Sequence, residues 1–385
     1  MAPMKDMLYE DFPSLLNFKV NFTPSVDSFV FRLHYRATYL IFMTGMLLTT
    51  LYDAVGDKIK CMTDLNQKVV ENYCFIMGTF TIDHLHNATV GVDVPHPGVG
   101  IQKPGDAITV HSYYQWVPFV LFINGILFYF PHWLWKGFEG GLFKTIVQSL
   151  SIRDYLKDNL KSWNNREIQY KNLSEYLRVH MHQHRLWCFK FFFCEALNLV
   201  VALFTLFFTN YFLDGEFLTY GSKVFEYINM DPEDRIDPMS YVFPRMAKCT
   251  YRLWGPSGTI MVRDVMCLIA TNVINEKIYV FLWVWLVFLT TVTSLWLVWR
   301  LLILTIPSLR SYILWSYANK SKEGDRATIM NHCTISDWFL LIHLGKNMDS
   351  KVFSDFVEHL AKDINEMKES TDTYRMEDLK KNHVI

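Results

Sequence analysis

The chain has 385 residues, of which 51% are hydrophobic and 16% aromatic, and its formal net charge is −1. It is therefore more apolar and more aromatic than an average soluble protein. A near-neutral chain has no concentrated excess of Lys and Arg for phosphate contacts, which excludes nucleic acid as a partner.

Four apolar segments are long enough to cross a bilayer, whose hydrocarbon core of about 30 Å requires roughly 20 residues of helix. The first run follows a mixed-charge segment and lacks a small-residue cleavage site, so it is expected to remain as a span and not to be removed as a signal peptide. The predicted spans are 37–55, 116–135, 188–213 and 278–306.

Four spans place both termini on one side of the membrane, and the basic residues indicate which side. The termini and the middle loop together carry 24 Lys and Arg residues, against 11 in the other two loops. The positive-inside rule therefore predicts a multi-pass membrane protein with both termini in the cytoplasm. The predicted cytoplasmic segments are 1–36, 136–187 and 307–385, and the predicted extracellular loops are 56–115 and 214–277.

The cysteines divide between these compartments. Cys61 and Cys74 fall in the first external loop and Cys249 and Cys267 in the second, an even number where disulfides form. Four cysteines permit three connectivities, and the residues alone do not choose among them. Four free buried thiols are the less favoured alternative. The other cysteines lie in the third span or the tail, where thiols stay reduced: Cys188, Cys194 and Cys333.

The external loops contain turn and strand signals. The first has a glycosylation acceptor at Asn87, in Asn-Ala-Thr, followed by a Pro- and Gly-rich stretch over 91–105 that predicts turns and short extended pieces. In the second, the alternating run over 249–254 and the turn residues of 255–258 predict a hairpin. Together the loops predict a small cap clamped by disulfides.

The predicted cytoplasmic segments have helical patterns. Charge spacing over 152–185 and an amphipathic stretch over 337–367 predict a helical dome. The polar residues from Glu369 onward are expected to lack regular structure. The fold class is thus an all-α membrane protein, a four-helix bundle with a disulfide-linked extracellular α/β cap and a cytoplasmic dome.

His180, His182 and His184 are the most enzyme-like feature, because membrane oxidases bind iron through histidine clusters. Only His180 and His184 would share a helix face, and the further clusters of a di-iron site are missing. A solvated basic helix is favoured. With no nucleophile or phosphate-binding motif in a usable place, we expect no enzyme, no cofactor and no metal, and a four-span metalloenzyme is the least favoured alternative.

Ionisable residues in the spans are costly and mark either function or helix pairing. Glu195, near Lys190 and Asn198 in the third span, fits both interpretations equally well. Arg300, at the inner end of the fourth span, is predicted to be a snorkelling anchor.

The first span carries Thr38, Gly45 and Thr49 at helical spacing, a mildly polar stripe. These residues are candidates for lining a pore, with helix packing as an equal alternative. Pro118 is expected to kink the second span or to lie in its first turn.

An acidic patch in the second external loop would form a ring in an oligomer and favour cations or bind calcium. A solvated face is the favoured interpretation, because the spacing does not match an EF-hand loop. The patch comprises Asp231, Glu233, Asp234 and Asp237.

Many short motifs in order resemble those of one known family. The most specific is Tyr113-Tyr114-Gln115-Trp116-Val117 at the start of the second span. The others are 31–35 (FRLHY), 133–136 (WLWK), 139–141 (EGG), 214–217 (DGEF), 237–239 (DPM), 243–245 (FPR), 248–250 (KCT), 255–258 (GPSG), 275–279 (NEKIY) and 337–341 (DWFLL). Over nearly its whole length the chain resembles the innexins, the gap-junction proteins of invertebrates, and its pattern is most similar to that of insect members.

This resemblance implies a pore-forming subunit that passes ions and small metabolites between adjacent cells. It implies a homo-oligomeric ring, an octamer, that docks with the hemichannel of the adjacent cell and can also contain other innexins, with membrane lipids around it. It further implies the bridges Cys61–Cys267 and Cys74–Cys249, a funnel formed by residues 1–36, and a contribution of the first span to the pore wall.

The chain departs from the family pattern at Phe75, where Trp is usual, at Pro118, and in the atypical segment through Asn21. Two alternatives therefore stay open. One is a non-junctional plasma-membrane hemichannel, in which a glycan on Asn87 prevents docking. The other is a non-conducting assembly or adhesion subunit that requires another innexin.

Overall fold

The computed structural model describes residues 26–148, 162–181, 183–230 and 237–382. The expected funnel through residue 25, His182 and the first three residues of the acidic patch lie outside this part of the chain. The chain divides into two compact units. Among the described residues, one unit lies within 28–137 and 190–302, and the other lies within 138–189 and 303–382.

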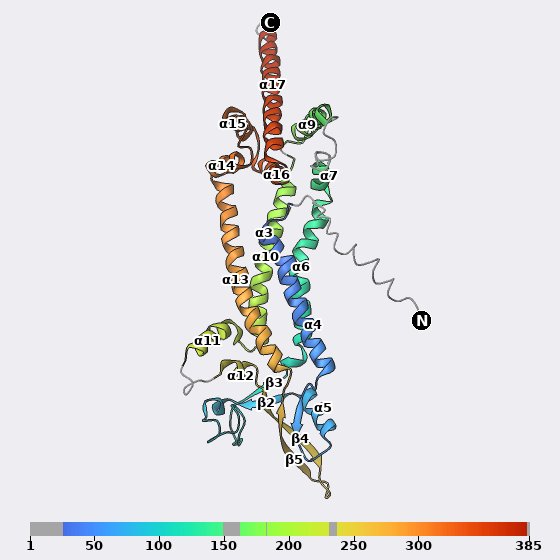
Figure 1. The fold of residues 1–385 in the computed structure, drawn as a ribbon, viewed down its shortest axis with the longest axis vertical. Coiled ribbons are helices and arrows are strands. Elements are labelled where there is room, and N and C mark those ends of the chain that lie inside the picture. Colours follow the sequence, from blue (N-terminus) through green and yellow to red (C-terminus); the bar gives the residue numbers. More distant parts are fainter. Residues whose placement is uncertain (1–25, 149–161, 182, 231–236, 383–385) are drawn as a thin grey trace, which may run out of the picture. The chain divides into compact units, whose positions relative to one another are not determined.

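In the part of the chain that the structure describes, four helices are long and apolar enough to cross a membrane, as predicted (Figure 1). The first consists of α3 (Phe29–Arg32), a π-helical turn (Leu33–Thr38) and α4 (Tyr39–Val55), and it begins before the apolar run. The others are α6 (Val117–Glu139), α10 (Arg185–Phe212) and α13 (Asn272–Thr305). Pro118 lies in the first turn of α6, where its missing N–H has no helical acceptor to lose.

Small residues let the first helix approach its neighbours. A Cβ on Gly45 would lie 3.6 Å from side-chain atoms of both Ile278 and Leu121, and one on Gly125 would lie 3.0 Å from Met43. Helices in lipid associate through such close packing, since burial of apolar surface provides little drive there. The contacts place α4 against α6 and α13.

Buried hydrogen bonds join the π-helical turn to α13. Nε2 of His34 lies 2.8 Å from Oγ1 of Thr293, and Nε1 of Trp285 donates to Oγ1 of Thr38 over 2.9 Å. In hydrocarbon an unpaired polar group costs several kcal/mol, so these contacts fix the rotation of the first helix about its axis.

A buried ion pair joins α10 to α13. The Glu195 carboxylate accepts hydrogen bonds from Nε and Nη2 of Arg300 and from Nε1 of Trp296, each at 3.1 Å. The Arg300 side chain is only 14% exposed and packs over the Trp296 ring. The prediction that Arg300 is a snorkelling anchor is therefore wrong, because the carboxylate one helix away offers a partner inside the bundle. For Glu195, helix pairing is the interpretation that the contacts support.

The loops between these helices build one antiparallel sheet. Its order is β1-β5-β4-β2-β3 among the described residues. The strands are β1 (Lys60–Met62), β2 (Thr79–Ile82), β3 (Ile108–His111), β4 (Met246–Trp254) and β5 (Ile260–Leu268). The predicted hairpin is confirmed as β4 and β5, paired from Met246 with Leu268 to Trp254 with Ile260.

Helices in the same loops had not been predicted. They are α5 (Gln67–Met77), α11 (Phe217–Asn229) and α12 (Pro238–Val242), with 3₁₀ turns at Asp83–Asn87 and Tyr113–Gln115. We call the disulfide-linked α/β region formed by residues 59–115 and 237–269 the cap.

The second unit is helical, in agreement with the predicted helical patterns. Its helices are α7 (Leu142–Gln148), α9 (Ser162–Val179), α14 (Pro307–Tyr317), α15 (Glu323–His332), α16 (Ile335–Lys346) and α17 (Ser350–Asn382). Leu314, Phe339, Phe353 and Phe356 are buried in this unit. The expectation that regular structure ends near Glu369 was wrong, because α17 continues to Asn382.

Two of the three clustered histidines serve packing in this unit. His180 stacks on the ring of Tyr176. His184 is buried, and its Nδ1 lies 3.3 Å from Oδ1 of Asp337, the residue that closes the capping box at the start of α16. The expected solvated basic helix is therefore incorrect for His184, whose partner comes from the distant tail.

The Glu195–Arg300 pair provides a test of the bundle. Removing one member of a buried ion pair costs about 3–5 kcal/mol, since the other charge loses its partner. Purified Glu195→Ala protein should therefore melt at a clearly lower temperature than the parent. Glu195→Gln keeps an acceptor for Trp296 and should lose less. Equal melting temperatures for all three proteins would show that the pair does not stabilise the bundle.

Candidate functional site: the disulfide-linked cap

Two disulfides join the first loop to the second. Cys61 and Cys267 are directly opposite in β1 and β5, with Cα atoms 4.0 Å apart. Cys74, on α5, is bonded to Cys249 of β4, with Cα atoms 5.8 Å apart. All four side chains are buried. The bridges therefore lie on one face of the sheet, beneath the helix that covers it.

These cysteines belong to the apolar core of the cap. Val70 of α5, Tyr114, Val265 and Ile269 are buried around them. Cys61, Cys74 and Cys267 are also the one group of three possible metal ligands found close together in the described residues, and their sulfurs are engaged in disulfides. This group of cysteines therefore stabilises the cap through disulfide bonds and is not a metal site.

The family-signature residues connect α5 to the start of α6. Nε2 of Gln115 donates to the carbonyl oxygens of Phe75 and Ile76, at 2.6 and 3.3 Å, and the Tyr114 hydroxyl lies 3.4 Å from the Phe75 carbonyl. The last carbonyls of a helix have no intrahelical partner. The signature therefore caps the C-terminus of the helix that carries Cys74.

The flanking signature residues face other layers. Tyr113 packs edge-on against Phe212 and Phe243, at the ends of α10 and α12. Trp116 is 60% exposed and contacts Phe119 on the outside of α6. The four consecutive signature side chains therefore have different partners. Tyr114 and Gln115 contact the end of α5, Tyr113 packs between the ends of α10 and α12, and Trp116 lies on the outer surface of α6.

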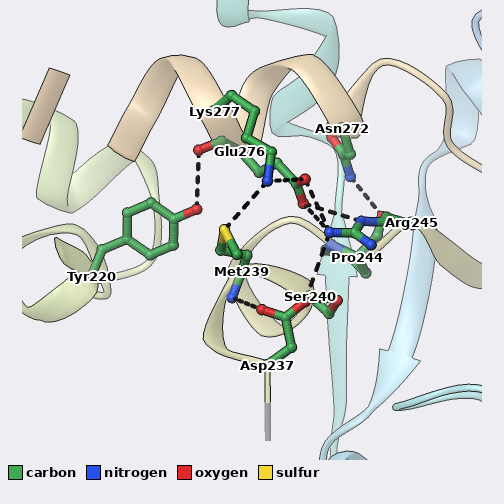
Figure 2. A network of polar contacts seen from close by, with 9 residues as sticks. All are labelled: Tyr220, Asp237, Met239, Ser240, Pro244, Arg245, Asn272, Glu276 and Lys277. Carbon is green, nitrogen blue, oxygen red and sulfur yellow. Dashed lines mark hydrogen bonds and ion pairs between the residues drawn. The ribbon is translucent and has the colours of Figure 1, made fainter. Parts of the chain in front are cut away.

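Figure 2 shows a polar network where the hairpin meets α13. The carboxylate of Glu276, almost fully buried, accepts bidentate hydrogen bonds from Arg245 at 2.9–3.1 Å and pairs with Lys277 at 3.1 Å. Arg245 also lies 3.7 Å from Asp237, which caps α12. Burial lowers the pKa of Arg245, but hydrogen bonds and charge interactions with Glu276 and Asp237 outweigh this effect and raise it.

Neutral hydrogen bonds complete this junction. Nδ2 of Asn272 donates to the carbonyl oxygen of Pro244 over 2.7 Å, and the Tyr220 hydroxyl donates to the main-chain oxygen of Glu276 over 3.2 Å (Figure 2). These contacts extend α13 six residues before the predicted span begins at residue 278. They also fix the direction in which β4 leaves the helices. Asp237, the one described residue of the acidic patch, is thus used as a helix cap and ion-pair partner.

The Pro- and Gly-rich loop is held against the sheet by one buried lysine. Nζ of Lys248 donates to the carbonyl oxygen of Gly100 over 2.7 Å and pairs with Asp264 at 2.9 Å. Asn87, the glycosylation candidate, is exposed at the end of its 3₁₀ turn and so has room for a glycan.

Two histidines line a cavity of about 180 Å³ beside β3. His111 is buried, and its Nε2 lies 2.8 Å from Oγ1 of Thr81. The pKa of His111 is lowered to about 4, mainly by burial and also by nearby His86, while Asp83 opposes the shift. Burial also lowers the pKa of His86. Both imidazoles are therefore neutral at physiological pH.

The three pore-lining candidates are buried within the chain. Thr38 accepts the hydrogen bond from Trp285, Gly45 faces α6 and α13, and Oγ1 of Thr49 donates to the carbonyls of Gly45 and Met46. A side chain enclosed by its own subunit has no surface to offer a pore. The contacts favour the alternative interpretation, helix packing, for all three.

The fold and the cap define a multi-pass membrane protein whose two loops form one disulfide-linked domain. A family model described as Innexin matches residues 27–364. The chain therefore belongs to the innexin family, the channel-forming proteins of invertebrate gap junctions, which confirms the resemblance in the sequence motifs. This is a family of channels and not of enzymes.

Individual relatives agree over most of their length. The chain is 42% identical to Innexin inx2 of Schistocerca americana over 342 residues, covering 88% of this chain and 93% of the relative. It is 40% identical to Innexin inx2 of Drosophila melanogaster, covering 88% and 91%, and 40% identical to Innexin shaking-B of the same species, covering 87% and 89%.

The signature glutamine can be tested for its role as a cap. Gln115→Ala removes the donor to the last carbonyls of α5 and should destabilise the protein by about 1 kcal/mol. Gln115→Glu has nearly the same shape but cannot donate, and it adds a negative charge beside a helix C-terminus. We expect it to lose at least as much in thermal unfolding. A Gln115→Glu protein as stable as the parent would contradict the capping role.

The buried imidazole predicts a pH dependence of stability. The unfolded chain has an ordinary histidine pKa near 6.5, so between pH 6.5 and about 4 it binds more protons than the folded cap. Stability should therefore fall by about 3 kcal/mol as pH drops through this window and level off below it. His111→Gln removes this titration and should give a flatter profile of melting temperature against pH. An unchanged profile would exclude His111 as the source.

Proposed function

We infer that this chain is the pore-forming subunit of a gap-junction channel, which passes ions and small metabolites between adjacent cells. The observation that carries this inference is innexin-family membership over residues 27–364, with four apolar helices and disulfide-linked loops in the same chain. The mechanism is passive conduction with no chemical step. The subunit assembles as an octameric ring, alone or with other innexins.

The proposed orientation places the cap outside the cell and both termini in the cytoplasm of a plasma-membrane channel. The two disulfides support this, because such bonds persist in oxidising compartments. The excess of Lys and Arg in the termini and middle loop supports it independently. The helical unit then forms the cytoplasmic dome, and the two bridges keep the cap rigid for docking with a ring in the neighbouring membrane.

The exposed face of the first helix is our proposal for its part of the pore wall. Of the four long helices described, this one has the lowest mean hydropathy, 1.3, and the smallest buried share, 22%. A helix whose exposed face contacts lipid should instead be among the most apolar of the four, so we expect the exposed face of this helix to contact water in the pore. Residues exposed at helical spacing along it are Arg36, Leu40, Thr44, Leu47 and Leu51. The N-terminal funnel stays a prediction for residues outside the described part.

Dual voltage clamp of paired oocytes that express only this chain tests the function. We expect junctional current between the cells, because one innexin subunit supplies both rings. Recordings from unpaired cells are made alongside. Current in unpaired cells alone would support the non-junctional hemichannel, and surface protein without any current would support the assembly or adhesion subunit.

The same recordings test the pore wall through a matched pair of variants. Thr44→Cys places a thiol on the exposed face, and Thr49→Cys places one five residues away on the buried face. A charged thiol-reactive reagent should reduce current through the first variant and leave the second unchanged. Equal block of both, or block of Thr49→Cys alone, would contradict the assignment.

A further inference from the structure

The helix α11 carries apolar side chains on more of its surface than the bundle covers. Its buried side belongs to the core of the bundle and comprises Phe217, Tyr220 and Val224. Beside that side, Leu218, Phe225 and Ile228 recur at helical spacing and are 41%, 50% and 61% exposed. We call these three residues the apolar stripe. Lys223 and Glu226 are exposed on the remaining, polar side of the helix.

The start of α11 is held at the end of a spanning helix. Residues 213–216 alone separate it from the last residue of α10. Asn210, in the last turn of α10, makes two contacts across this turn. Its Oδ1 accepts a hydrogen bond from the main-chain N–H of Leu218 over 3.0 Å, and its carbonyl oxygen accepts one from the N–H of Gly215 over 2.7 Å. The helix α11 therefore begins where the chain leaves the bilayer.

A second spanning helix supports α11 along its length. Nε1 of Trp283, on α13, donates to the carbonyl oxygen of Leu218 over 3.0 Å. A Cβ on Gly221 would overlap the Trp283 ring, so the glycine lets α11 lie directly on that ring. Figure 1 shows α11 beside α13 and running across its direction. The apolar stripe is thus fixed in orientation by two helices that cross the membrane.

Exposed aromatic residues indicate the level of the membrane surface on this side of the bundle. Trp116, directly before α6, is 60% exposed, and Tyr211, in the last turn of α10, is 82% exposed. Trp and Tyr are enriched where spanning helices meet the headgroup region of a bilayer. Tyr211 directly follows Asn210, which holds the start of α11. The helix α11 therefore lies at the level that these aromatic residues indicate.

The apolar stripe continues into an exposed apolar side of α13. The rings of Phe225 and Trp283 are neighbours, with centroids 6.4 Å apart. Val287, one helical turn beyond Trp283, is 39% exposed, and Val284 is 42% exposed. Apolar side chains on the outside of a spanning helix are in contact with lipid acyl chains. The stripe extends this surface beyond the spanning helix itself.

We propose that α11 lies in the membrane interface on the cap side of the bundle. Its apolar stripe contacts the acyl chains just below the headgroups, and its polar side faces water. A helix with one apolar and one polar side binds a bilayer surface in this way. The occupant of the stripe is thus lipid of the leaflet on the cap side. This inference rests on the four spanning helices, goes beyond the proposed channel function, and gives the second loop an anchor on the membrane.

Fluorescence quenching at single labelled positions tests where the stripe lies. Phe225→Cys places a thiol on the stripe and Glu226→Cys places one on the polar side. Both are made in the full chain with Cys333→Ser, since Cys333 is the one free cysteine that is not buried. The proteins are labelled with bimane and reconstituted in phosphatidylcholine vesicles. Phosphatidylcholine brominated near the top of its acyl chains should quench the probe at 225 several-fold more than the probe at 226. Iodide in the water should show the reverse order.

A second pair of variants on the same helix makes the test independent of one position. Ile228→Cys and Ser222→Cys should repeat the order of the first pair, and mapping of both disulfides verifies the folding of every variant. Equal quenching by brominated lipid within each pair would overturn the proposal. A probe at 225 that is shielded from brominated lipid and from iodide alike would also overturn it, because protein such as a neighbouring subunit would then cover the stripe. Neither result concerns conduction, which the paired-cell recordings test separately.

Discussion

The covalent connection between two distant loops is the constraint on which the cap depends. The bridges join residues 206 and 175 positions apart, so neither loop can order its cysteines without the other. In the chain-entropy model a closed loop of this size stabilises the folded state by about 5 kcal/mol. This is an upper bound here, since helices already inserted in a membrane bring the loop ends together. The bridges also allow a domain with a helix on only one face of its sheet to persist.

Polar contacts at the helix ends turn this constraint into a fixed geometry. Gln115 caps the helix that carries Cys74, and Glu276 holds the arginine that precedes β4. Each contact fixes one loop to the helix beside it, and the disulfides fix the loops to each other. A displacement of the hairpin is therefore opposed at α13, at α5 and at the bridges. The buried Glu276 carboxylate is stable only because Arg245 and Lys277 surround it, since a buried charge without a partner costs several kcal/mol.

Features that depend on local sequence could be predicted. Apolar run length was enough for the four long helices, and alternation with a Gly-Pro-Ser-Gly turn was enough for the β4–β5 hairpin. Cysteine count and topology indicated disulfides, but the residues left three connectivities open. The resemblance implied Cys61 with Cys267 and Cys74 with Cys249, and the structure contains these bridges. The helix α5 was missed because its short amphipathic pattern is stabilised by a capping residue about forty positions later.

Features that depend on a distant partner could not be predicted from residue type. Arg300, near the end of the fourth span, was predicted to snorkel, and only the carboxylate of Glu195 on another helix shows that its side chain is held in a buried ion pair. Thr38, Gly45 and Thr49 form a stripe that sequence alone assigns equally to water or to packing. Trp285 and Ile278, from the fourth helix, occupy the space beside two of them. Once that face is filled, a helix that still contributes to a pore must use its opposite side. On that side Thr44 interrupts a row of leucines, so the pore wall that we propose would be mainly apolar, with the charge of Arg36 near the N-terminal end of the helix.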